Sequence, residues 1–287
     1  MPLSHPPLEH LPIRRLTADD LQACADLSEN RGWQREEHKW GLLLTAGVGY
    51  GIDDPSGAGL VTACVVMSYG PGLGAIGMVL VAERYARQGV GRRLMRYVLA
   101  EAGNTPLSLY ATSNGQPLYE QLGFTETGRS EMLLGRFTLT EPAPDRGVRP
   151  ATAEDVQHVL RLDREIFGVD RTHLITRLPA FADHLRVAEQ DGKITGFAAL
   201  WPNMDTHVIG PLIAHDPATA QALVASLAEA SDRPLRTDVD TRHTPLLTWL
   251  KANGLEQIAT TSIMIRSLPD LPGDWTRRFA PLTVAAG

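Results

Sequence analysis

The stretch that decides the fold begins with an apolar run, Gly77-Met-Val-Leu-Val81, which predicts a buried strand. The turn Ala82-Glu-Arg-Tyr-Ala-Arg-Gln-Gly-Val-Gly91 follows, and the sequence from Arg92 to Ala102 has the apolar spacing of an amphipathic helix. Glycines let a backbone turn sharply and approach a ligand closely. We therefore expect the amides of residues 87–92 to point outward at the start of the helix, where the helix dipole favours anions.

This turn matches neither of two common nucleotide-binding motifs. No Gly-Lys-Ser/Thr follows the glycines, which excludes a Walker A loop, and no third glycine follows Gly89 and Gly91, which excludes Gly-x-Gly-x-x-Gly. Arg87, Arg92 and Arg93 add positive charge for a phosphate. The turn alone leaves open an ordinary surface connection whose arginines are solvated.

Length and composition limit the class of protein. The chain has 287 residues, which favours two domains at about 150 residues each. Apolar residues make up 43% and the net charge is −6, so general binding to nucleic acid or to an anionic membrane is not expected. No apolar run approaches the roughly 20 residues of a membrane-spanning helix. The polar, Pro/His-rich start Met1–Pro12 does not have the pattern of a signal peptide, so we expect a cytoplasmic protein.

The two cysteines, Cys24 and Cys64, fit neither a disulfide framework nor the spacing of a metal site. We expect both to be buried as small apolar side chains, and we expect no metal.

The chain looks duplicated. Ile13-Arg-Arg-Leu-Thr-Ala-Asp-Asp-Leu21 recurs as Val148-Arg-Pro-Ala-Thr-Ala-Glu-Asp-Val156, and each copy reads as a short strand, a threonine N-cap and an acidic first helical turn. A strand that begins Ile-Gly also occurs in each half, at Ile76 and at Ile209. The stretch 141–147 is rich in Pro and Gly and is typical of a linker. Strands that alternate with helices predict layered α/β (or α+β) structure in both halves.

A second motif, ATSNGQPLYEQLGF, spans residues 111–124. It reads as the end of a strand, then a short helix with Pro117 in its first turn and Gly123 as its C-cap. Together with the glycine turn, over roughly residues 74–125, this pattern resembles the GNAT superfamily of N-acetyltransferases. The order of elements is similar to that family from Ile13 to Phe137.

The resemblance implies a fold and a set of binding residues. There would be two tandem GNAT-like domains, 1–140 (catalytic) and 148–287, each a mixed, mostly antiparallel sheet flanked by helices. The family has Arg or Gln where this chain has Ala86, so Arg87 is expected to compensate. The residues implied to hold acetyl-CoA are Val79, Leu80 and Val81 for the pantetheine arm, Arg87, Gln88, Gly89, Val90, Gly91 and Arg92 for the pyrophosphate, and Asn114 as a further contact.

Tyr119 lies where the family's general acid lies. In acetyl transfer a neutral amine attacks the thioester carbonyl, and the departing thiolate needs a proton that a tyrosine hydroxyl could give. A strand amide near Val79 could stabilise the oxyanion. The alternative for Tyr119 is a ring that only packs.

The general base is not identified by the sequence. Glu83 is the nearest carboxylate after the strand, and Asp53 and Asp54 read as turn formers. Trp33 and Trp40 are candidates either for the wall of the acceptor site or for the core.

The second half lacks both motifs. Its loop after Ile213 has no Gly-x-Gly, Asp216 would repel a phosphate, and Leu247 stands where the first half has Tyr119. This half resembles the C-terminal domain of tandem GNAT proteins of the YitH type. We expect a degenerate domain that completes an acceptor pocket between the halves or is structural. The polar candidates for such a pocket are Asp170, Arg171, His207, Asp238, Asp240, Arg242 and His243.

Asp238 and Asp240 are spaced to share one strand face. They could grip an ammonium group, or they could only cap the helix that follows.

The expected function is acetyl-CoA-dependent N-acetyl transfer by direct attack, with Tyr119 as the acid and the amine of a small metabolite or amino-acid-like molecule as acceptor. A protein lysine or N-terminal acetyltransferase and a non-catalytic acyl-CoA sensor are the alternatives. The sequence specifies neither the acceptor, the length of the acyl group nor the oligomeric state.

Overall fold

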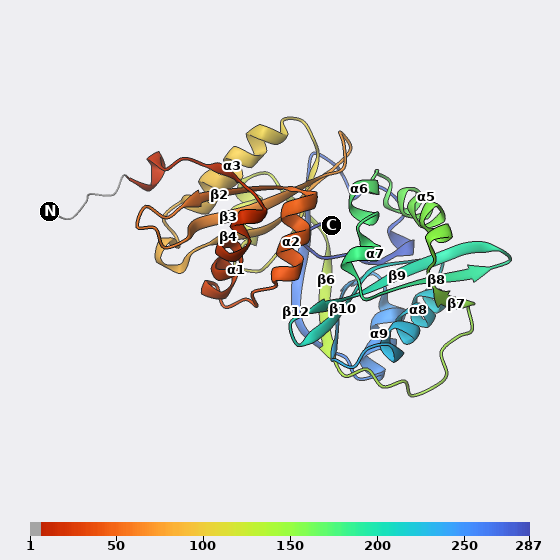
Figure 1. The fold of residues 1–287 in the computed structure, drawn as a ribbon. Coiled ribbons are helices and arrows are strands. Elements are labelled where there is room, and N and C mark those ends of the chain that lie inside the picture. Colours follow the sequence, from red (N-terminus) through yellow and green to blue (C-terminus); the bar gives the residue numbers. More distant parts are fainter. Residues whose placement is uncertain (1–6) are drawn as a thin grey trace.

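The computed structural model describes residues 7–287, so the first six residues of the Pro/His-rich start lie outside the described part. Residues 7–140, called here the first half, and residues 148–287, the second half, follow one another in Figure 1 from red to blue. The first half contains β1 (Arg14–Leu16), α1 (Leu21–Asn30), α2 (Glu37–Ala46), β2 (Val48–Asp53), β3 (Leu60–Ser68), β4 (Gly74–Val81), α3 (Val90–Ala102), β5 (Leu107–Ala111), α4 (Gln116–Gln121) and β6 (Thr125–Gly135).

The second half repeats this order, with two short helices where the first half has α2, and adds a short strand at its end. Its elements are β7 (Val148–Pro150), α5 (Val156–Phe167), α6 (Thr172–Ile175), α7 (Leu178–Phe181), β8 (His184–Gln190), β9 (Lys193–Asn203), β10 (Thr206–Ala214), α8 (Pro217–Glu229), β11 (Leu235–Asp240), α9 (Thr244–Ala252), β12 (Glu256–Arg266) and β13 (Arg278–Ala280).

All these strands form one sheet, in the order β1-β2-β3-β4-β5-β12-β6-β11-β10-β9-β8-β7, with β13 beside β10. The two halves exchange their long final strands: β12 pairs with β5 of the first half, and β6 pairs with β11 of the second. β6 and β12 also pair with each other, and they run together through the middle of Figure 1. Each half is thus a mixed, mostly antiparallel sheet with flanking helices, as predicted, and the structure adds that the two sheets are continuous.

The duplicated segments adopt the same local structure in both halves. Arg14 of β1 donates to Asp20 at 2.6 and 3.0 Å and to Asp53 at 2.7 Å. Arg149 of β7 donates to Asp155 at 2.7 and 2.9 Å and to Glu189 at 2.6 and 3.0 Å. In each copy the acid closes a capping box with the threonine that begins the turn. The predicted repeat is therefore confirmed at the level of side-chain contacts.

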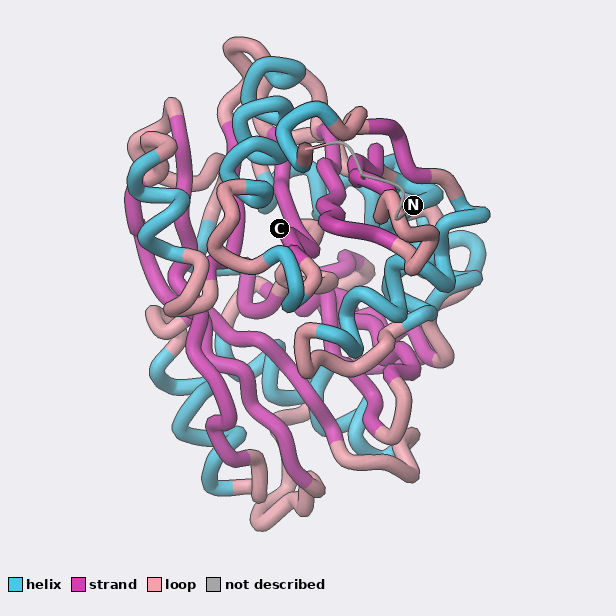
Figure 2. Tube along the Cα trace, turned by 90° about the vertical axis from the view of Figure 1, so that its left-hand side faces the viewer, coloured by secondary structure: helices cyan, strands magenta, loops and turns pink. Residues whose placement is uncertain are grey.

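The helices cover both faces of the sheet, as Figure 2 shows. In the first half, α1 and α2 pack on one face in the cluster that includes Trp40, Leu43 and Val65. Helices α3 and α4 pack on the opposite face in a cluster that includes Leu94 and Leu109. The α1/α2 cluster continues into the second half through α5 to α7 and into Leu282, Ala285 and Ala286 near the end of the chain. Cys24 and Cys64 are both fully buried and unpaired, as expected.

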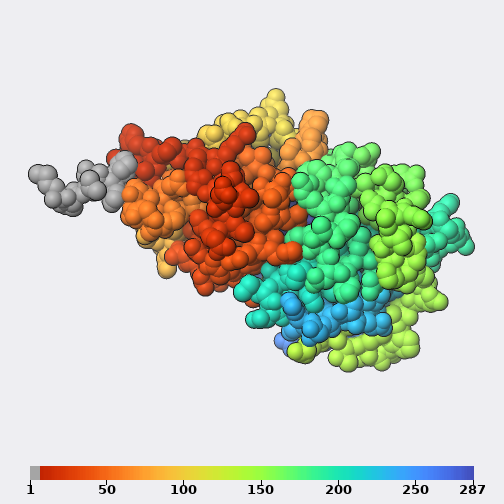
Figure 3. Space-filling view, in the orientation of Figure 1, coloured from red at the N-terminus to blue at the C-terminus, as the bar shows by residue number. Residues whose placement is uncertain are grey.

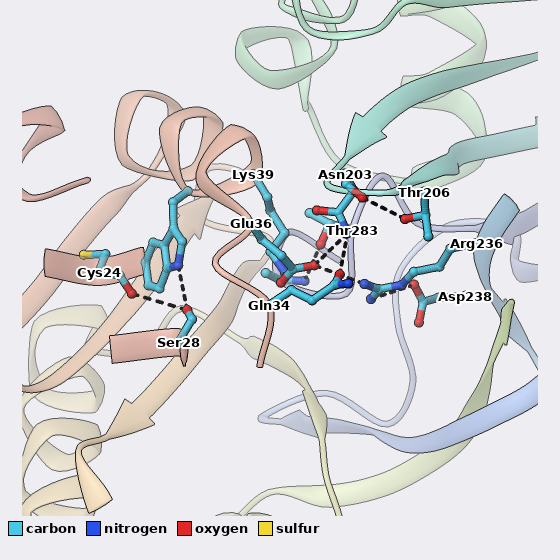
Figure 4. Close-up of polar contacts among 12 residues, drawn as sticks. Cys24, Ser28, Gln34, Glu36, Lys39, Asn203, Thr206, Arg236, Asp238 and Thr283 are labelled. Carbon is cyan, nitrogen blue, oxygen red and sulfur yellow. Dashed lines mark hydrogen bonds and ion pairs between the residues drawn. The ribbon is translucent and has the colours of Figure 1, made fainter. Parts of the chain in front are cut away.

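A buried polar cluster joins α2 to the second half (Figure 4). Glu36, just before α2, accepts hydrogen bonds from Arg236 at 3.0 Å and Asn203 at 3.2 Å and from Lys39. Burial disfavours the Glu36 carboxylate, but Lys39 and Arg236 outweigh that effect and hold its pKa below the usual value. The two halves also meet at the surface, where orange residues lie directly against green ones in Figure 3.

No helix among residues 7–287 is long and apolar enough to cross a membrane.

Candidate active site

The site begins where β4 and β5 part. The two strands pair in parallel only over Gly74–Ile76 and Leu107–Leu109. Met78 then takes a left-handed φ of +53°, and the register against β3 shifts between the pairs Val65–Gly77 and Ala63–Leu80. This β-bulge turns the rest of β4 away from β5. The gap leaves one edge of β4 without a strand partner, which gives an extended ligand backbone groups to bind.

The predicted pantetheine-binding residues follow the bulge. Leu80 faces β3, because its carbonyl accepts from Thr62 Oγ1 at 2.6 Å. Since backbone groups alternate in direction along a strand, those of Val79 and Val81 face the gap. The structure therefore brings two of the three residues to the gap by their backbone, while the Leu80 carbonyl is already engaged.

The glycine turn leads from β4 into α3. Gly89 is the N-cap of α3 with a φ of +81°, and Arg87 is also left-handed, with a φ of +59°. Among residues 7–287, no acceptor is recorded for the amides of residues 87–92. Gly91 lies close to β4, because a Cβ there would be 3.2 Å from a methyl group of Val81. A set of free amides at a helix N-terminus is suited to a phosphate.

Two of the three arginines that were expected near a phosphate, Arg92 and Arg93, form hydrogen bonds within the protein. Arg93 donates to the carbonyls of Leu8, at 3.0 Å, and Leu11, so its side chain is engaged with the segment before β1, and its phosphate role stays a prediction. Arg92 donates to Gln121 of α4. Arg87 is exposed, and Gln88 donates to the carbonyl of Arg84 at 2.9 Å. The backbone of the turn, with Arg87 beside it, is what remains free for an anion.

Asp54 accepts hydrogen bonds from residues that precede the glycine turn, a role that the sequence did not indicate. It accepts from Tyr85 Oη at 2.7 Å, from the Ser56 amide at 2.7 Å and from Arg84. Burial would raise the pKa of Asp54, but the hydrogen bonds from Ser56 and Tyr85 outweigh this and lower it. Asp54 is thus both the predicted turn former and the residue that fixes the short helical turn Glu83–Tyr85 before the glycines.

Tyr119 lies on α4, on the α3 side of the sheet. Its ring is buried in the cluster that contains Ile76 and Leu109, the last paired residues before the gap, and it meets the Phe124 ring edge-on at 6.1 Å between centroids. Burial raises the pKa of Tyr119. The Tyr119 hydroxyl is therefore neutral at physiological pH, and its role as the general acid stays a prediction.

The other candidates from the first half differ in burial and in position. Asn114 is exposed in the turn before α4. Glu83 begins the short helical turn Glu83–Tyr85 that follows β4 and is exposed. Trp40 is fully buried and donates to Ser28 Oγ at 2.9 Å, which makes it a core residue, whereas Trp33 is exposed.

The corresponding gap in the second half is filled by the chain itself. β10 and β11 pair only at His207–Leu235 and Val208–Arg236, and β13 then pairs with β10 through Ala280 and Arg278. The α8 N-terminus is capped by Asp216, which accepts from the Thr219 amide at 2.8 Å. This half therefore offers neither a free strand edge nor a free helix start at that place.

The polar candidates of the second half are already paired within the protein. Asp238 and Asp240 do share a strand face, but Arg236 and Arg242 pair with them. His207 contacts Ser231 and Asp183, Asp170 pairs with Arg164, and Arg171 with Asp163. His243 contacts the carbonyl of Arg278 at 2.9 Å. The two aspartates are therefore not an open site for an ammonium group. No cluster suited to a metal occurs among the described residues.

The segment 282–287 closes the α1/α2 face of the sheet beside the gap. A Cβ at Gly77 would overlap the backbone of Ala285, so only glycine allows this approach. Tyr69 Oη donates to the carbonyl of Ala286, and Arg171 donates to that of Gly287 at 3.2 Å. Figure 1 shows this end of the chain between the two halves.

Comparisons with known proteins agree with this geometry. Models of the acetyltransferase (GNAT) domain match residues 51–126 and 159–280, which together are more than half of the chain. The uncharacterized N-acetyltransferase YitH of Bacillus subtilis is 27% identical over 236 residues, 81% of this chain and 83% of that protein. The holothin acyltransferase of a Pseudoalteromonas species is 26% identical over 222 residues, 76% of this chain and 74% of that protein.

Solved structures show the same fold over nearly the whole chain. A protein of Pyrococcus horikoshii assigned as an acetyltransferase superimposes with a TM-score of 0.80 at 19% identity, over 99% of this chain and 98% of its own. A tandem GNAT protein from the clavulanic acid biosynthesis pathway gives a TM-score of 0.64 at 13% identity, over 91% and 100%. The chain thus belongs to the GNAT family of acetyltransferases, with two such domains in tandem.

Proposed function

We propose that the first half catalyses transfer of an acetyl group from acetyl-CoA to the amine of a small metabolite or amino-acid-like acceptor. One observation carries this proposal: the free edge of β4 begins after Ile76, which belongs to the same core cluster as Tyr119, and leads to the free amides of the α3 N-terminus. The residues present fit acetyl-CoA, since the edge suits an amide-containing arm and the turn suits a pyrophosphate.

The residues of this chain divide the work in the transfer. The amides of residues 87–92 bind the diphosphate, and Val79 and Val81 orient the arm along the gap. The acceptor amine attacks the thioester carbonyl directly, because both reactants are held together and no covalent enzyme intermediate is needed. Tyr119 gives its hydroxyl proton to the departing thiolate. The proton that the amine loses passes to water, and water reprotonates the Tyr119 phenolate.

A small acceptor is favoured over a protein because the α1/α2 face beside the gap is already covered. The segment 282–287 packs there against Gly77 and Tyr69, and α2 is tied to the second half through Glu36. A peptide would need an open groove across this face. Helices α5 to α7 of the second half pack in the same core cluster as α1 and α2. The gap between β10 and β11 is filled by β13.

The test combines acetyl-CoA binding by calorimetry with CoA release in a panel of amino acids, their amides, amino sugars, polyamines and lysine peptides. We expect binding, and release that depends on a small amine. Release with lysine peptides alone would favour the protein acetyltransferase. Binding with no release on any amine would favour an acyl-CoA sensor, and no binding would refute the assigned site.

A further inference from the structure

Three arginines approach one another on the side of the sheet that carries segment 282–287. Arg171 and Arg278 both stack on the ring of Phe167, with their guanidinium carbons 3.6 and 4.8 Å from its centroid. Arg242 stacks on Trp275 at 4.4 Å. Trp275 lies against the ring of His243 at 5.8 Å between centroids, and His243 contacts the carbonyl of Arg278 at 2.9 Å, so the three arginines share one neighbourhood.

Two of these arginines are neutralised and one is not. Arg171 forms a buried bidentate pair with Asp163, and Arg242 pairs with Asp240. Among residues 7–287, no carboxylate pairs with Arg278, whose recorded side-chain hydrogen bond is a long one of 3.4 Å to the carbonyl of Pro272. Burial lowers the pKa of Arg278, and Arg171 and Arg242 lower it further, although Tyr110 and Asp240 oppose this. Arg278 is thus a guanidinium with no carboxylate directly paired to it among the described residues.

The position of Arg278 links it to the transfer site. β13 carries Arg278 in the filled gap of the second half, opposite Ile213. Tyr110 follows Leu109, the last residue of β5 that pairs with β4. Tyr110 is in register with Ile263 of β12, and Ile263 with Gly128 of β6, beside which the Arg242 guanidinium of the same cluster lies. Tyr110 therefore stands at the edge of the first half's gap, and burial raises its pKa to about 12, so its hydroxyl remains neutral. Both side chains keep some exposed surface, so a ligand in this region can reach them.

We propose that Arg278 binds an anionic group of the acceptor, so that the amine substrate carries a carboxylate. A guanidinium offers two parallel N–H donors that fit a carboxylate, and phosphate shares this chemistry. A buried charge without a partner is unfavourable, so a bound anion would supply the direct partner that Arg278 lacks among the described residues. This inference rests on the proposed function, because it deepens the choice of acceptor.

The first experiment tests the anion site without turnover. Succinate and inorganic phosphate are titrated at constant ionic strength, with CoA present, and the melting temperature is followed. The wild type should be stabilised by succinate, and Arg278→Gln should lose most of that shift. Arg277→Gln is the matched control, because Arg277 lies next to Arg278 but is already paired with Glu165 at 2.6 Å. It should keep the shift. Stabilisation by phosphate alone would assign the site to phosphorylated amines, and an equal shift in Arg278→Gln would overturn the proposal.

The second experiment compares matched acceptors, namely amino acids and their amides. The ratio of kcat/KM for acid over amide should fall at least tenfold in Arg278→Gln and partly recover in Arg278→Lys. Affinity for acetyl-CoA should not change in either variant, which separates a failure here from a failure of the proposed function. An unchanged ratio would overturn the proposal.

Folding of the variant provides a further control. The ligand-free Arg278→Gln protein should melt at or above the wild-type temperature, because a buried unpaired charge has been removed. If it melts well below, Arg278 acts through packing on Phe167 and the proposal fails.

Discussion

At the scale of single residues, one substitution at Tyr119, the proposed proton donor, tests the mechanism directly. Tyr119→Phe removes one hydroxyl and keeps the ring that packs on Phe124. We expect turnover to fall about 10²-fold while acetyl-CoA affinity stays the same, because the hydroxyl acts on the leaving thiolate. Since burial raises the pKa of Tyr119, the acid form should persist and wild-type turnover should not decline from this group below about pH 10.

Steady-state kinetics and calorimetry check this expectation. Tyr97→Phe is the control, because Tyr97 is exposed and lies on the outer face of α3. Wild-type turnover in Tyr119→Phe would leave the ring with a packing role alone.

At the scale of elements, the turn between β4 and α3 should depend on backbone conformation rather than on space. Gly89 has a φ of +81° with open space around its would-be Cβ, so Gly89→Val introduces strain without a clash. A left-handed residue with a branched side chain costs about 1–2 kcal/mol, and the turn can relieve this by rotating its amides away from the diphosphate. We expect acetyl-CoA affinity to fall at least tenfold.

Gly192 provides a matched control for that variant. It has a φ of +72° with equally open space, in the turn between β8 and β9 of the second half. Gly192→Val should have a similar effect on the melting temperature and no effect on acetyl-CoA affinity. Equal affinity in the two variants would contradict the assignment of the turn.

The local parts of this site were predictable because their signals are local. The apolar run at Gly77–Val81, the glycine turn and the Pro117 helix start each arise from a few neighbouring residues, and all three form as expected. The bulge has its left-handed residue at Met78 and not at the neighbouring Gly77, so the position of the glycine does not predict it. The Arg93 side chain donates to the carbonyls of Leu8 and Leu11, and the Arg278 side chain stacks on Phe167 of α5. Such partners are distant in sequence, so no short pattern indicates them.

At the scale of the whole molecule, exchange of β6 and β12 makes the two halves one cooperative unit. Neither half completes its sheet without a strand from the other, and the core cluster around Trp40 continues to Phe167 and Ile213. Loss of support in either half should therefore unfold both. The two repeated arginine networks, one at each outer end of the sheet, offer a way to examine this.

Acid should destabilise the whole chain through these networks. The hydrogen bonds from Arg14 and Arg149 lower the pKa values of Asp20 and Asp155 below their unfolded value of about 3.9. The unfolded chain thus binds more protons, so the stability from these pairs is present above about pH 4 and is lost as pH falls through the folded pKa values. We expect the urea midpoint to be flat from pH 5 to 7 and to fall below about pH 4, with a single unfolding transition at each pH.

Arg149→Met should lower the urea midpoint between pH 5 and 7 and make its fall at acid pH shallower. Arg161→Met, at an exposed position of α5, should leave both as in the wild type. Two separate transitions would contradict the cooperative unit, and an unchanged decline in Arg149→Met would remove the network from the acid response.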